Sequence, residues 1–218
     1  PEPYWEEALR RDPGDLRAHI GYGRRLLDQG RLPEAAGHFE TAIRRLTLRH
    51  PTPSTGEAHY HLGVVYRFQG RIDEAYAAFY KATWDGAWCA PAYCELAALD
   101  CRRGDYEQAR DHADASLDAG RRNNKAWILS CLAGEQLGLD VSSTWESLLA
   151  EDPLDHWARY ASGDVEGFLA HSRNDAQTVL DIAYEYADAG FIGEALDVLT
   201  LHHARPVPPV AVPNPMAR

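Results

Sequence analysis

The sequence is short of basic charge, of cysteine and of long apolar runs, and each shortage argues against a class of protein. Its 22 Lys and Arg face 33 Asp and Glu, a formal net charge of −11, so no surplus of cations can neutralise nucleic acid or an anionic membrane. No apolar run reads as a signal sequence or a transmembrane helix. The few cysteines fall at helical, core-like positions: Cys89, Cys94, Cys101 and Cys131. We expect free thiols in a reducing compartment and therefore a cytoplasmic protein.

Motifs of catalysis and cofactor binding are missing as well. The chain has no H-E-x-x-H, G-x-S-x-G, phosphate loop or dinucleotide fingerprint, and its carboxylates are scattered rather than paired. His59 and His61, two residues apart on an expected helix, point to different sides and make a poor metal pair. Cys94 and Cys101 fit buried small side chains better than a zinc site. We therefore expect no enzyme activity, no metal and no cofactor.

The sequence does contain a pattern that occurs four times, in which a glycine is followed five residues later by an alanine. The pairs are Gly30 and Ala35, Gly70 and Ala75, Gly104 and Ala109, and Gly190 and Ala195. The second copy is the fullest, with Leu62, Gly63 and Tyr66 before the glycine and Phe79 and Ala82 after the alanine. This pattern resembles the motif of the tetratricopeptide repeat (TPR), L-G-x-x-Y…G…A-x-x-x-F-x-x-A. The resemblance implies an all-α, right-handed TPR solenoid of antiparallel helix pairs, about five to six units long.

The spacing of the glycines sets the expected units. The steps from Gly70 to Gly104 and from Gly104 to Gly138 are both 34 residues, the TPR period. The step from Gly30 is six residues longer, and the surplus falls at 49–56, where we expect a loop with Ser54 or Thr55 capping the next helix. The units are a half repeat at 3–13, repeats at 15–50, 56–88, 90–122 and 124–152, a degenerate pair at 154–173 and a last repeat at 175–203.

The periodicity of apolar residues and the positions of Gly and Pro predict the bounds of the individual helices. They are expected near 3–11, 15–29, 32–48, 56–69, 72–85, 90–103, 106–119, 124–137, 142–151, 154–162, 164–172, 175–189 and 192–203. The TPR solenoid thus spans 1–203, and the proline-rich 204–218 is expected to be an extended linker or tail. Since the chain opens midway through a repeat and without an initiator Met, we expect it to be a piece of a larger protein.

The concave surface of a TPR array is lined by the first helix of each unit, so the resemblance implies a binding groove. The matching positions are Arg24, Tyr60, Val64, Arg67, Phe68, Cys94, Arg102 and Ile128. An aromatic and basic groove in an acidic protein favours an extended or acidic peptide, although solvated arginines that bind nothing are the simpler interpretation. TPR modules that bind the acidic C-terminal tail of chaperones resemble one another in a carboxylate clamp of Lys and Asn on the inner helices. The corresponding positions here hold other residues: Ile20, Arg24, Tyr60, Val64, Cys94 and Ala98. This difference disfavours a chaperone tail as the ligand.

Four aromatic residues recur every four positions after Gly70: Tyr76, Tyr80, Trp84 and Trp88. Packing against the following unit is the simpler interpretation of this aromatic stripe, and a ridge that binds a partner or a sugar is the alternative. The stripe and the preceding Tyr-Arg-Phe-Gln-Gly-Arg run resemble the TPR region of large bacterial proteins that also carry an uncharacterised β-rich domain.

Two functions follow from these patterns. The first is a non-catalytic interaction scaffold that binds a peptide or protein on a curved helical surface. The alternative is an accessory domain that docks onto and supports an enzyme domain in the same full-length chain, with a carbohydrate-active enzyme as one candidate. Neither interpretation involves nucleic acid or a membrane.

Overall fold

The computed structural model describes residues 2–48, 55–120, 122–173 and 175–203. These residues form thirteen helices and no strand, which confirms the all-α class. The helices are α1 (Glu2–Arg11), α2 (Leu16–Asp28), α3 (Leu32–Thr47), α4 (Glu57–Phe68), α5 (Ile72–Ala82), α6 (Cys89–Arg103), α7 (Tyr106–Ala119), α8 (Asn124–Gln136), α9 (Ser142–Glu151), α10 (His156–Ala161), α11 (Val165–His171), α12 (Ala176–Asp188) and α13 (Ile192–His203). The surplus loop at 49–54 and the proline-rich 204–218 lie outside the described residues.

Polar side chains cap six of the helices after α1. A side-chain oxygen accepts a hydrogen bond from a backbone N–H of the first turn at Asp15, Asp105, Asn123, Asp155, Asp164 and Asp175. Gly56 precedes α4 without a side-chain cap, and the Thr55 hydroxyl oxygen instead accepts from the Glu57 N–H at 3.2 Å. Of the two predicted capping residues, Thr55 makes this bond and Ser54 lies outside the described residues.

The repeated glycines end the first helix of each pair. Gly30, Gly70, Gly104, Gly138 and Gly190 have φ between +72° and +89°, the left-handed conformation that glycine adopts without steric cost. Gly163, between the short helices α10 and α11, has the same conformation at φ +87°. The degenerate pair therefore keeps the turn of the repeat, although its helices have only six and seven residues.

The alanines that follow the glycines let the two helices of a pair approach closely. Ala35, Ala75 and Ala109 are fully buried and Ala195 nearly so. The pairs α2–α3, α4–α5, α6–α7 and α12–α13 each pack along their length, as the repeat pattern predicts.

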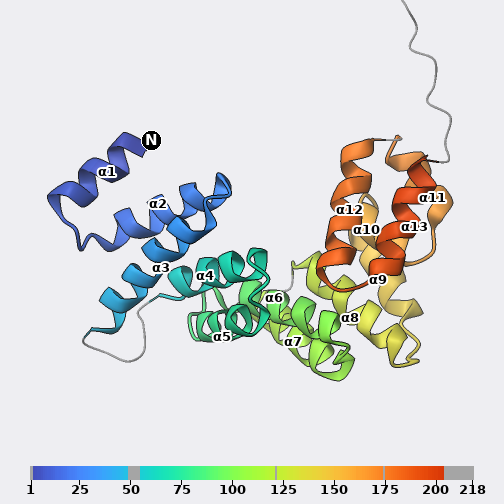
Figure 1. Cartoon of the computed structure of the whole chain (residues 1–218). Coiled ribbons are helices and arrows are strands. Elements are labelled where there is room, and N and C mark those ends of the chain that lie inside the picture. Colours follow the sequence, from blue (N-terminus) through green and yellow to red (C-terminus); the bar gives the residue numbers. More distant parts are fainter. Residues whose placement is uncertain (1, 49–54, 121, 174, 204–218) are drawn as a thin grey trace, which may run out of the picture.

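The pairs follow one another from α1 at one end to α13 at the other, and the C-terminal helices α10 to α13 stand upright beside the row formed by α2 to α8 (Figure 1). One large apolar core runs from α6 to α13, while smaller clusters join α2 to α6. Across the described ranges, no helix combines the length and apolar character needed to cross a bilayer.

Candidate functional site

The predicted groove residues do not form one continuous open surface. Arg24, Phe68 and Arg102 are exposed, and Tyr60 and Val64 are half-buried. Cys94 and Ile128 are buried in the core at 4% and 1% exposure, so the expectation that they face a ligand is wrong. Their small or apolar side chains fill the space between successive units instead, because α6 and α8 are covered on both sides.

Arg67 is also buried, because the last unit packs over it. Its guanidinium lies 3.0 Å from Glu95 Oε2 and also pairs with Asp188 of α12, a residue 121 positions away. The side chains of all three are about nine-tenths buried. The prediction that Arg67 lines an open groove is therefore corrected by a contact between distant units.

Lys125 of α8 completes this buried charge cluster. Its Nζ lies 2.7 Å from Glu185 Oε2 and 3.9 Å from both Glu95 and Asp188. Burial lowers the pKa of Lys125, but the carboxylates Glu95 and Glu185 outweigh it and the net shift is upward. Burial raises the pKa of Asp188, against the opposing pull of Arg67 and Lys125. These ion pairs fix α12 against α4, α6 and α8, so the middle of the predicted groove is occupied by the chain's own last unit.

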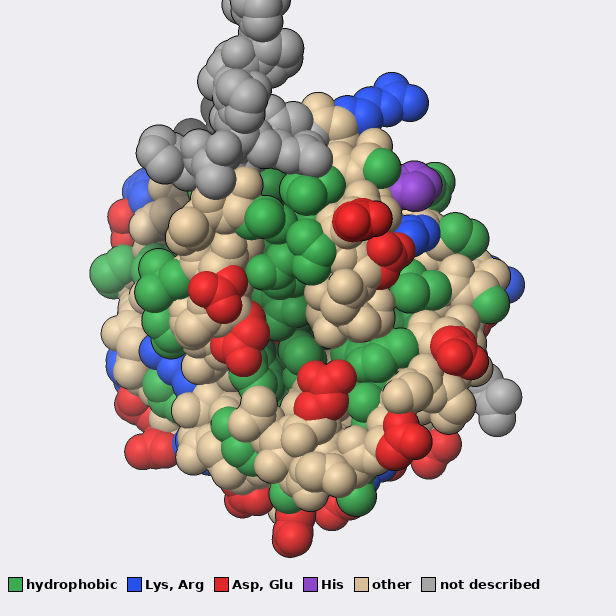
Figure 2. All heavy atoms as spheres, turned by 90° about the vertical axis from the view of Figure 1, so that its right-hand side faces the viewer, with side chains coloured by type: hydrophobic (Ala, Val, Ile, Leu, Met, Phe, Trp, Pro, Cys, Tyr) green, Lys and Arg blue, Asp and Glu red, His purple; other side chains and the backbone are tan. Residues whose placement is uncertain are grey.

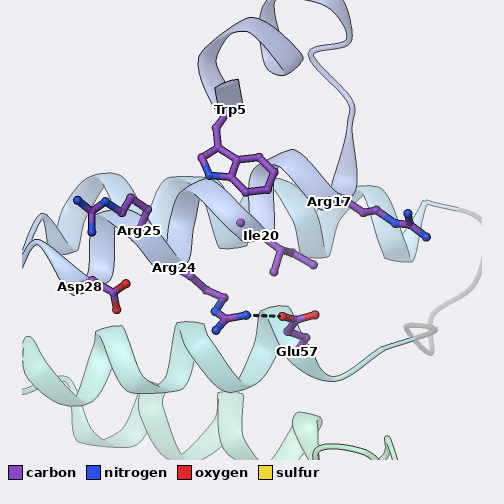
Figure 3. Close-up of a pocket in the computed structure, with 8 residues that line it drawn as sticks. Trp5, Arg17, Ile20, Arg24, Arg25, Asp28 and Glu57 are labelled. Carbon is purple, nitrogen blue, oxygen red and sulfur yellow. Dashed lines mark ion pairs between the residues drawn. The ribbon is translucent and has the colours of Figure 1, made fainter. Parts of the chain in front are cut away.

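The N-terminal part of the concave surface stays open, as a pocket of about 530 Å³ between α1, α2 and α4 (Figure 3). We call it the N-terminal pocket. It is lined by Trp5, Arg17, Ile20, Gly21, Arg24, Arg25, Asp28 and Glu57. Of the predicted groove residues it contains Arg24, and it adds residues that the groove prediction missed.

The apolar wall of the N-terminal pocket depends on a glycine. A Cβ on Gly21 would lie 2.6 Å from Cη2 of Trp5, so a side chain at this position would displace the indole from its place against α2. Ile20, which is buried, continues the apolar surface beside it. The half repeat α1 is therefore not only a terminal cover, since its Trp5 builds part of a concave surface.

The charged wall of the pocket is basic on balance. Arg17, Arg24 and Arg25 are exposed and stand against Asp28 and Glu57, a local excess of one positive charge in a chain of net charge −11. Arg24 Nη1 lies 3.6 Å from Glu57 Oε1 (Figure 3), and more than half of the Arg24 side chain is exposed. This loose pair leaves guanidinium N–H groups facing the pocket, where they can bind a carboxylate.

A sequence signal for the pocket did exist. Arg17, Gly21, Arg24 and Asp28 follow one another at spacings of four, three and four along α2, the spacing of one helix face. The groove prediction, which rested on repeat positions, included Arg24 as its one residue of this helix.

The aromatic stripe separates into two packed and two exposed residues. α5 ends at Ala82 rather than at residue 85, so Trp84 and Trp88 lie beyond it. Tyr76 contacts the ring of His112 in the following unit and the guanidinium of Arg103, 4.6 Å from its ring centre, whereas Trp88 packs back on Tyr60 and His61. Tyr80 and Trp84 are 50% and 59% exposed. Only this exposed half has a free surface for the proposed binding ridge.

The histidines and cysteines singled out in the sequence are accounted for by packing. His59 is buried, and His61 stacks on Phe39 at 5.6 Å between ring centres; burial lowers the pKa of both imidazoles to about 4. All four cysteines are free thiols, and Cys94, Cys101 and Cys131 are buried, as predicted, whereas Cys89, which was also expected at a core-like position, is half-buried. Over the described part of the chain, no group of three or more His, Cys, Asp or Glu is placed to hold a metal ion.

Comparison with known proteins agrees with this architecture. Residues 2–47 and 23–87 match the family model of the tetratricopeptide repeat. Among solved structures, YrrB, described as a TPR protein with an unusual peptide-binding site, is 16% identical, with a TM-score of 0.60 over 90% of this chain and 97% of its own. A tetratricopeptide repeat protein of Parabacteroides merdae is 15% identical (TM-score 0.63, 93% and 84% covered). PilF of Pseudomonas aeruginosa is 16% identical (TM-score 0.59, 89% and 95% covered). At these identities the likeness shows the fold alone, and the chain has the fold of a TPR solenoid.

Proposed function

We propose that the protein is a non-catalytic scaffold that binds an acidic, extended peptide segment in the N-terminal pocket. The observation that carries the proposal is that three exposed arginines and an indole line one pocket, with Arg24 at its centre and Arg17 and Arg25 toward its two ends (Figure 3), in a chain whose net charge is strongly negative. Guanidinium groups bind carboxylates with charge-assisted hydrogen bonds, and the Trp5 ring offers an apolar surface to a neighbouring side chain.

The fold supports a peptide as the class of ligand. TPR arrays present a rigid curved surface on which partners are bound, and YrrB, a neighbour in fold, is described as having a peptide-binding site. The ligand would reach the pocket beside α1 and α2 rather than the middle of the array, because α12 occupies the space over Arg67.

A charge-reversal experiment tests the proposal. The probe is a fluorescein-labelled peptide that alternates glutamate with leucine, and its binding is followed by fluorescence anisotropy at low salt. Arg24→Glu is expected to weaken binding at least tenfold, because it replaces attraction by repulsion at the pocket wall. Arg44→Glu is the matched control, since Arg44 is also exposed but lies on α3 outside the pocket.

The result also has to depend on the sign of the charge. A lysine–leucine peptide of the same length should bind the wild-type chain more weakly than the glutamate–leucine peptide. Equal loss of binding in Arg24→Glu and Arg44→Glu, or a preference for the lysine peptide, would disprove the assignment of the pocket.

The alternative function, support of a β-rich enzyme domain in the same polypeptide, rests on the resemblance to large bacterial proteins. It stays a prediction, as does the cytoplasmic location. Tight docking of this chain onto such a domain, unaffected by Arg24→Glu, would favour it over peptide binding.

A further inference from the structure

The C-terminal end of the array carries an apolar face that no described residue covers. Figure 2 shows it as a band of hydrophobic side chains along the exposed helices, with acidic side chains on both sides. Its members are Leu180 and Tyr184 of α12, 53% and 47% exposed, and Ile192, Leu196 and Leu199 of α13, 54%, 58% and 36% exposed. We call these five residues the end face.

The repeat register identifies what this face is built to hold. Gly190 follows Gly70 by 120 residues, so the end face corresponds, position by position, to five residues of the second unit: Tyr60, Val64, Ile72, Tyr76 and Phe79. In the second unit these residues pack with Leu96 and Leu99 of α6, the first helix of the next unit, and Phe79 is fully buried. The same positions thus bind a helix inside the array and lie exposed at its end.

The two helices that carry the end face are acidic, while the cations Arg67 and Lys125 lie on the inner side near Tyr184. The described parts of α12 and α13 contain Asp181, Glu185, Asp188, Glu194 and Asp197 but no Lys or Arg. Glu185 and Asp188 are tied to Lys125 and Arg67 on the inner side. Asp181 and Asp197 remain exposed, so two end faces brought together would place like charges side by side.

We propose that the end face is a docking site for an amphipathic α-helix whose apolar stripe is flanked by Lys or Arg. Helix α6 shows the pattern: Leu96 and Leu99 supply the stripe, and Arg103 lies over the ring of Tyr76 and pairs with Asp73 at 2.6 Å. The helix for the end face needs apolar residues at i, i+3 or i+4 and i+7 and cations that meet Asp181 and Asp197. This site differs from the N-terminal pocket in its location, at the other end of the array, and in the charge of the ligand that it binds.

The test uses α6 itself as the model for the probe. The probe is a fluorescein-labelled, hydrocarbon-stapled peptide of residues 89–103 with its three cysteines replaced by alanine and with Glu95→Lys and Asp100→Lys. Circular dichroism verifies its helicity first. Anisotropy should detect binding to the whole chain, and Leu180→Asp and Leu196→Asp should each weaken it at least tenfold. Leu48→Asp is the matched control, since Leu48 is also exposed, at 66%, but lies at the end of α3.

A second peptide tests the charge. It keeps Glu95 and Asp100 and carries Arg102→Glu and Arg103→Glu, and it should bind at least tenfold more weakly at low salt. All variants are checked for native helix content, which the exposed positions should preserve.

Three results would overturn the proposal. The first is binding of the basic helix that Leu180→Asp and Leu196→Asp leave unchanged. The second is a dimer of the wild-type chain, seen by light scattering and lost in Leu180→Asp, which would assign the face to a second copy. The third is tenfold tighter probe binding by a Val210→Asp chain, which would assign the face to residues 204–218.

Discussion

Two glycines, one in each of the first two units, show how single residues control the spacing of the helices. Gly23 and Gly63 occupy equivalent positions, and a Cβ on either would lie 2.8 Å or 2.7 Å from the ring of Phe39 or Phe79. Both rings are fully buried, so they have no free space to move into. The glycine of the repeat motif is thus required by a phenylalanine sixteen residues later in the same motif.

Gly63→Ala is expected to destabilise the protein although alanine is the better helix former. The added methyl group overpacks the space against Phe79, a change that typically costs ~1–3 kcal/mol. Gly37→Ala is the matched control, because Gly37 lies inside α3 with no atom near its missing Cβ and should gain up to about 1 kcal/mol. Urea unfolding followed by circular dichroism measures both; a Gly63→Ala chain as stable as Gly37→Ala would contradict the packing argument.

At the scale of elements, the turn between α12 and α13 differs from the other turns in what lies beside it. Gly70 and Gly190 both adopt the left-handed conformation at the end of a first helix. A Cβ on Gly70 would meet nothing within 4 Å, whereas one on Gly190 would lie 2.6 Å from the Cα of Arg102. The turn at Gly190 therefore closes the helix pair and also presses it against the end of α6.

Gly190→Ala is expected to be more damaging than Gly70→Ala. Both substitutions place an alanine at positive φ, at a cost of about 1 kcal/mol. Only Gly190→Ala adds a clash with a backbone atom, which cannot rotate away, and a further ~1–3 kcal/mol is expected. Thermal unfolding of the two variants gives the comparison, and equal melting temperatures would show that α6 and the turn are not in firm contact.

At the scale of the whole molecule, the array closes on itself. Units of a solenoid ordinarily contact only their neighbours, but here Asp188 of the last unit pairs with Arg67 of the second. α12 packs on both α10 and α6. The long-range ion pairs should make the unfolding of the two halves more cooperative than a linear array allows.

Arg67→Met tests this closure. The substitution leaves Glu95 and Asp188 buried with too little positive charge, and removing one partner of a buried pair costs about 3–5 kcal/mol. The rate of amide hydrogen exchange should increase more in α12 and α13 than in α2 and α3. Arg71→Met, which removes an exposed pair with Glu74, is the control and should leave the exchange pattern unchanged. Unaltered protection of α12 in Arg67→Met would show that the cluster does not hold the units together.

The sequence by itself determined the helices and their pairing. The turn glycines, the alanines and the 34-residue step are local features, and local spacing sets which face of a helix is apolar. Only the tertiary structure decided which first-helix residues stay open to a ligand. No local pattern encodes how distant units pack on one another, so the burial of Arg67 under α12 could not be predicted. The buried position of Cys94 was expected from its residue type, and the error was to place the same residue in the groove. The same closure leaves Arg24 in an open pocket at one end and the end face exposed at the other.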